Sequence, residues 1–171
     1  LERLGVRFDL TVEPGRKEIP TYHPGHPYTG TLPSFVGIPP APYHPSKTDF
    51  RVADPTRKDG IWIIPMSTGR SPYGRAADLY HRVRHPRHHT DVIKALNLMH
   101  WPRTFLSIVN ELLARLARPY LSIVLRVDAF QNARSFNHVK QNMAALQQHP
   151  RASEFIFVTQ AEALHILGLG A

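Results

Sequence analysis

Two acidic residues and one arginine lie near the ends of apolar runs. Asp9 belongs to the alternating run "VRFDLTV", and Arg126 and Asp128 follow the run "YLSIVL". Ligand sites of parallel sheets and barrels gather at the carboxyl ends of strands, so Arg126 and Asp128 are candidates for chemistry. Arg126 and Asp128 are two positions apart and share one face of an extended strand. The pair could bind a carboxylated sugar or form an ion pair at the mouth of a barrel, and Asp9 could equally be an ordinary surface residue.

The stretch "TYHPGHPYTG" holds a second set of candidates. His23 and His26 are three positions apart, and each is followed by a proline that forbids a regular helix. This arrangement disfavours a metal site, and we predict no metal-binding motif in the chain. It favours a stiff loop that positions aromatic rings, and it leaves open direct contact with a saccharide by His23, His26, Tyr28 and Tyr43.

A third candidate is the basic stretch "HRVRHPRHH", residues 81–89. Arg82 and Arg84 stand among its histidines and would repel a divalent cation. An anion, such as a phosphate or an acidic sugar, is the better ligand. The alternative is a solvated basic loop with no ligand.

The composition narrows the class of protein. The chain has 171 residues, 42% of them hydrophobic, no cysteine and a formal charge of +8. It is long enough for one folded domain, cannot form a disulfide or thiolate site, and is expected to attract polyanions. No apolar run is long enough to span a membrane. A nucleic-acid-binding module is less favoured, because no helix-turn-helix, zinc-finger or RNP signature is present.

Strands and helices are predicted to alternate in the second part of the chain. We expect one domain over residues 1–171, with a long, ordered, proline-rich loop region at 14–59 and alternating helix and strand units at 60–171. Such alternation favours an α/β fold with a parallel sheet or barrel. The predicted strands are 6–12, 60–67, 120–130 and 154–159, and the predicted helices are 90–101, 104–118, 133–149 and a capped helix starting at Thr159.

The order of these motifs resembles the later portion of polysaccharide deacetylases of the NodB-homology type. The resemblance rests on "LGVRFDLTVEPG", "TYHPGHPYTGTLPSF", "PPAPYHPS", "GIWIIPMS" and the passage from "YLSIVLRVDAF" to "FVTQAEAL". It implies the C-terminal part of a distorted (β/α) barrel with a proline-rich loop insertion. It also implies a hydrolase that uses a zinc-like divalent metal to remove acyl groups from amino sugars of a cell-surface polysaccharide, in the bacterial cytoplasm or cell envelope.

The resemblance assigns catalytic roles to Asp9, Arg126 and Asp128, and it departs from the family at two points. The chain contains no Asp-Asp pair, so the metal-binding half is expected upstream of Leu1. Arg126 stands where the family has a proton-donating histidine, and arginine cannot donate a proton near neutral pH. The protein is therefore either a hydrolase completed by another segment or an inactive saccharide binder. In both cases an upstream segment or a second chain is expected to cover the edge of strand 6–12.

Overall fold

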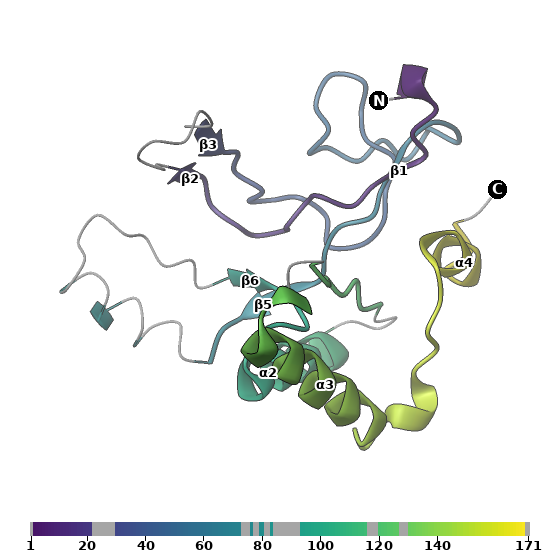
Figure 1. The fold of residues 1–171 in the computed structure, drawn as a ribbon. Helices are drawn as coiled ribbons and strands as arrows, with labels where there is room; N and C mark the ends of the chain where they lie inside the picture. The colour runs from purple at the N-terminus through teal and green to yellow at the C-terminus, as the bar shows by residue number, and fades with distance from the viewer. Residues whose placement is uncertain are drawn as a thin grey trace.

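The computed structural model describes residues 2–21, 30–72, 76, 79–80, 83, 93–115, 120–126 and 130–169. We divide it into a loop region (described residues between 2 and 72) and a helical region (described residues between 93 and 169), which meet where β5 lies beside β6 and α2 (Figure 1). The strands are β1 (Phe8–Asp9), β2 (Ile19–Thr21), β3 (Gly30–Leu32), β4 (Trp62–Ile63), β5 (Thr68–Arg70) and β6 (Ile93–Ala95). The helices are α2 (Pro102–Arg115), α3 (Ala133–Gln147) and α4 (Gln160–Ile166), with single 3-10 turns at Glu2–Leu4 and Ala152–Glu154.

The strands form three two-stranded sheets. β1 and β4 are parallel, with Phe8 opposite Trp62 and Asp9 opposite Ile63, and the Met66 amide extends this pairing to the Val12 carbonyl. β2 pairs antiparallel with β3, and β5 pairs antiparallel with β6. The described residues therefore form a mixed α/β structure. They contain no closed barrel, and the predicted barrel stays a prediction.

The helical region has a conventional core. α2 and α3 pack side by side, and α2 also covers β5 (Figure 1). On α2 the buried side chains recur at i, i+3, i+4 and i+7, as expected for the inner face of an amphipathic helix, and α3 and residues 96–98 supply the rest of the core. The core residues are Leu96, Leu98, Phe105, Ile108, Val109, Leu112, Val139 and Leu146.

The loop region has a smaller core without helices. Its buried side chains are Val12, Phe35, Ile38, Tyr43 and Ile63. Short local hydrogen bonds shape the connecting loops. For example, the carboxylate of Asp54 accepts from the Thr56 amide at 3.0 Å and the Thr56 hydroxyl at 2.6 Å. The described residues of the 14–59 segment form turns and short strands, and the predicted long ordered loop stays a prediction.

Three element predictions hold. Helices were expected at 104–118 and 133–149, and α2 and α3 occupy most of these ranges. The capping box of the third is also confirmed, since the Thr159 hydroxyl accepts from the Glu162 amide while the Glu162 carboxylate accepts from the Thr159 amide.

Other element predictions were wrong or only partly right. The described part of the predicted helix at 90–101, residues 93–101, is β6 followed by a turn, because backbone pairing with β5 overrides a weak helical pattern. The strands predicted at 6–12 and 60–67 are reduced to the short β1 and β4. Residues 120–126 are extended but make only an isolated bridge, between Asn97 and Val124.

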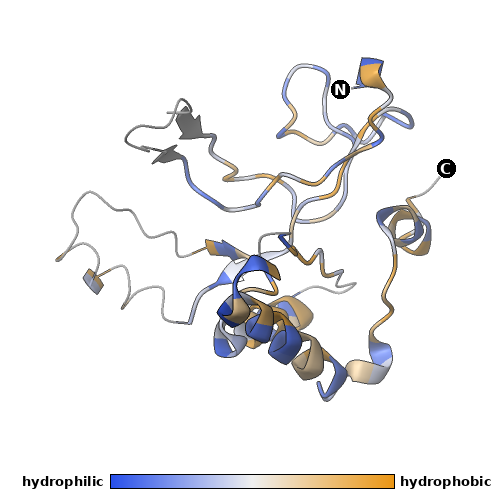
Figure 2. Cartoon of the chain, viewed as in Figure 1, coloured by the Kyte–Doolittle hydropathy of each residue, from blue (hydrophilic) through white to orange (hydrophobic). Residues whose placement is uncertain are grey.

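The prediction of a buried strand at 154–159 was also wrong. No strand forms there, and Ile156 and Phe157 are 72% and 65% exposed. Figure 2 shows this segment as an apolar stretch leading to α4. Among the helices that the structure describes, none has the length and apolarity to cross a membrane.

Candidate functional site

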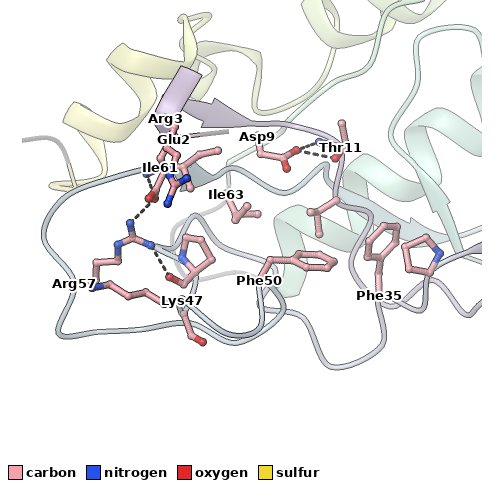
Figure 3. Close-up of a pocket in the computed structure, with 14 residues that line it drawn as sticks. Glu2, Arg3, Asp9, Thr11, Phe35, Lys47, Phe50, Arg57, Ile61 and Ile63 are labelled. Carbon is pink, nitrogen blue, oxygen red and sulfur yellow. Dashed lines mark hydrogen bonds and ion pairs between the residues drawn. The ribbon is translucent and has the colours of Figure 1, made fainter. Parts of the chain in front are cut away.

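A hollow of about 610 Å³ runs along the β1–β4 pair (Figure 3). Figure 3 shows it extending from an ion pair between Glu2 and Arg57 at one end to Phe35 at the other. Its walls combine two carboxylates, two hydroxyls, two phenyl rings and three cationic side chains. The lining residues are Glu2, Arg3, Asp9, Thr11, Val12, Pro33, Phe35, Pro45, Ser46, Lys47, Phe50, Arg57, Ile61 and Ile63.

Asp9 is held in a fixed orientation at the end of β1. Its Oδ1 accepts from the Thr11 amide at 2.9 Å and from the Thr11 hydroxyl at 2.7 Å. Both bonds reach the same oxygen, and within the described residues Oδ2 receives no hydrogen bond. An ionised carboxylate has lone pairs on both oxygens, so Oδ2 can accept from a ligand in the hollow.

Tyr43 lies beneath this site. Its side chain is 6% exposed, and its hydroxyl donates to the Phe50 carbonyl at 2.8 Å. Its backbone exchanges two hydrogen bonds with Ile63, at 3.0 and 2.9 Å. Burial, and then the negative charges of Asp9 and Asp49, raise the pKa of Tyr43 to about 12. Tyr43 therefore shapes the hollow by holding Phe50 and keeps a neutral hydroxyl at ordinary pH.

The far end of the hollow is closed by an ion pair that the sequence did not indicate. Arg57 Nη2 contacts Glu2 Oε1, and Arg57 Nη1 donates to the Pro45 carbonyl at 3.1 Å. Glu2 Oε1 also accepts from the Ile61 amide at 3.0 Å, and this bond is the main reason that the pKa of Glu2 lies below its usual range. Glu2 and Arg57 are far apart in the sequence, and neither belongs to a motif that could have signalled the contact.

The structure brings together only part of the predicted site. Asp9 and Tyr43 lie close enough for the Asp9 charge to influence Tyr43. Arg126 is exposed at the end of the extended segment 120–126, and it does not line the hollow. The other predicted site residues lie outside the described residues: His23, His26, Tyr28, Arg82, Arg84 and Asp128.

The described residues do not fit a metal ion. They contain no group of three or more histidine, cysteine, aspartate or glutamate side chains that could hold one. In the hollow itself, Asp9 Oδ1 is engaged by Thr11 and Glu2 by Arg57. We therefore derive no chemical step through a metal.

A second hollow, of about 650 Å³, lies between residues 120–123 and the segment that leads into α4. Its lining is mainly apolar and includes Ile156, Phe157 and Val158. Its polar side chains include Arg151 and Glu154, which pair with each other at 2.5 Å. It offers few polar groups that could orient a ligand or take part in a reaction.

Comparison of the chain with family models, curated proteins and solved structures found no match.

Proposed function

We propose that this chain is the saccharide-binding part of a carbohydrate-active hydrolase of the polysaccharide deacetylase type. The observation that carries the proposal is the hollow beside the parallel β1–β4 pair, where an oriented carboxylate stands close to aromatic rings. Sugar sites commonly combine apolar or aromatic surfaces with a few placed polar groups. The proposed ligand is an acylated amino sugar of a cell-surface polysaccharide.

Each wall of the hollow has a role in this proposal. Phe50, which is 41% exposed, offers apolar surface to the carbon–hydrogen face of a pyranose, and the buried Phe35 packs behind it edge-on. Asp9 Oδ2 accepts a hydrogen bond from a hydroxyl or from the amide of the acylated amino group. Arg3 and Lys47 are exposed at the hollow and would attract an acidic saccharide.

Hydrolysis of the acyl group also needs a group that activates water and a group that donates a proton. Arg126 cannot donate a proton near neutral pH, and the described residues offer no metal set. In this proposal, both functions come from residues outside the described part or from another polypeptide segment. Asp9 then binds and orients the substrate.

The free edge of β1 supports the same proposal. β1 pairs only with β4 among the described strands, so no described strand covers its other edge. Unpaired edges promote association with another strand. We propose that an upstream segment or a second chain covers this edge and completes the site.

A second candidate is an inactive saccharide binder. It is favoured by the absence of a metal set from the described residues and by arginine at position 126. It shares the ligand of the first proposal and differs only in the chemical step.

One experiment separates the two candidates. N-acetylated amino-sugar oligomers are titrated into the protein by calorimetry, and acetate release is measured with and without a divalent metal. Asp9→Asn is expected to weaken binding by about fivefold or more, because it replaces a charged acceptor. Asp54→Asn is the matched control, since Asp54 makes the same pair of bonds to Thr56 outside the hollow.

The outcomes are distinct. Binding with metal-dependent acetate release supports the hydrolase. Binding without release by the longest native form of the protein supports the inactive binder. No binding at millimolar oligomer, or equal losses in the two variants, would overturn the proposed site.

A further inference from the structure

An exposed tryptophan forms a second polar and aromatic surface, in the helical region. Trp101 immediately precedes α2 and is 63% exposed. The guanidinium carbon of Arg134 lies 5.3 Å from its ring centroid, and the ring of His138 lies 6.0 Å away at 48°. Arg134 and His138 are one turn apart on α3, so the two side chains lie on one side of that helix. We call these three residues the Trp101 platform.

Hydrogen bonds from α2 and α3 hold the backbone that carries Trp101. Asn142 is fully buried on α3, and its amide donates to the carbonyls of Leu98 and His100, both at 2.8 Å. The Trp101 carbonyl accepts from the amide of fully buried Phe105 at 3.0 Å. The loop that carries Trp101 is thus tied to both helices. A ring held in this way loses little conformational freedom when a ligand stacks on it.

The two sequence segments that carry the platform have basic but no acidic residues. Residues 92–110 and 129–153 contain no aspartate or glutamate. Arg134 is exposed, and on another side of α3 the ammonium of Lys140 lies 4.6 Å from the centroid of the Phe136 ring. The complementary ligand is therefore an anion.

The hydrogen bonding of His138 indicates which further group the anion should carry. Its Nδ1 lies 3.1 Å from the Met99 carbonyl. A carbonyl only accepts hydrogen bonds, so Nδ1 carries the proton, and in the neutral ring Nε2 is an acceptor. Nε2 can then accept from a ligand hydroxyl. Each ring of a saccharide offers several hydroxyls that could serve as this donor.

We infer that the Trp101 platform binds an acidic saccharide, with a uronic acid unit stacked on Trp101. The carboxylate of the sugar pairs with Arg134, and one hydroxyl donates to His138 Nε2. This surface consists of different residues from the Asp9 hollow, and the inference does not depend on hydrolysis. It gives the protein a second contact with an anionic polysaccharide.

The test uses oligogalacturonate as the probe and intrinsic fluorescence as the readout. The chain has two tryptophans, so Trp62→Phe leaves Trp101 as the single reporter. We expect oligogalacturonate to change the Trp101 emission with saturation. By calorimetry, Trp101→Ala should weaken binding by about tenfold, the size of one lost stacking contact. Arg134→Gln should weaken binding of oligogalacturonate but not of its methyl-esterified form.

Phe157→Ala is the matched control, because Phe157 is equally exposed but lies outside the platform. It should leave binding unchanged, and circular dichroism checks that every variant is folded. Equal losses from Trp101→Ala and Phe157→Ala, or no loss from Trp101→Ala, would overturn the inference. Tighter binding of an oligothymidylate than of oligogalacturonate at the same salt concentration would also overturn it and assign the surface to nucleic acid.

Discussion

The loop region and the helical region bury side chains by different means. In the helical region, the buried residues follow helical spacing, and α2 and α3 supply most of them. In the loop region, the buried residues have no common spacing and are held by turns and by bonds such as that between Tyr43 and Phe50. Burial therefore depends on periodic helix packing in the helical region and on individual hydrogen bonds in the loop region.

The two regions meet at a polar junction. The Ser67 hydroxyl accepts from the Ser122 amide at 2.8 Å and donates to the Tyr120 carbonyl at 3.2 Å. Thr68 pairs with Ala95 of β6 in the helical region, while its buried hydroxyl donates to the Pro14 carbonyl of the loop region at 2.7 Å. Ser67 and Thr68 lie near the end of a predicted strand, and the structure shows that they join the regions.

The largest expected effect is in the helical core. Phe105→Ala should lower the free energy of unfolding by about 3–5 kcal/mol, because it leaves a cavity at a fully buried site. Urea titration followed by helical circular dichroism measures this loss. Phe157→Ala should change stability by less than about 0.5 kcal/mol, since Phe157 is mostly exposed. A loss below about 1 kcal/mol for Phe105→Ala would show that the helical region lacks the tight core described above.

A smaller effect is expected at the junction. Ser67→Ala should destabilise the protein by about 2 kcal/mol, because the Ser122 amide loses its acceptor. Hydrogen exchange would show whether the two regions still unfold together. Ser46→Ala serves as a control, since the Ser46 hydroxyl bonds only within its own loop. Equal effects of the two substitutions would show that Ser67 contributes no more than an ordinary loop serine.

Tyr43→Phe tests the loop region. It should lower the free energy of unfolding by about 1 kcal/mol, because the hydrogen bond from the Tyr43 hydroxyl to the Phe50 carbonyl is lost. The pKa of Tyr43 is raised to about 12, above the value near 10 in the unfolded chain. The unfolded state therefore loses this proton first, and the stabilisation is present below pH 10 and declines as the pH rises toward 12. The stability difference between the wild type and Tyr43→Phe should shrink between pH 8 and pH 11 in urea titrations. A difference that does not change with pH would contradict the raised pKa.

The smallest effect should be confined to α4. Thr159→Ala removes the hydroxyl of the capping box and should cost about 1 kcal/mol of local helix stability. Amide exchange should accelerate in α4 and stay unchanged in α2 and α3. Thr159→Ser keeps the hydroxyl and is expected to restore protection. Faster exchange throughout the helical region would show that α4 is part of the helical core.

The sequence predicted the elements whose signals are local. α3 and α4 follow from apolar spacing and from the Thr159–Glu162 pair, which are visible in a short window. The apolar run at 154–159 was predicted to be a buried strand. This was wrong, because an apolar sequence does not specify what covers it. The Asp9 carboxylate was a candidate only through the family resemblance, and its hydrogen bonds to Thr11 were not predicted. The contact between Glu2 and Arg57 could not be foreseen, because it depends on how distant loops come together.

The exposed segment before α4 has a practical consequence. Residues 156–158 are extended, and their amides make no hydrogen bond within the described residues. Proteases recognise substrates in this exposed and extended form. A protease with aromatic specificity can therefore cut after Phe157 without first unfolding the helical core. A single cut there would break the covalent link between α4 and the helical core and leave α2 and α3 intact.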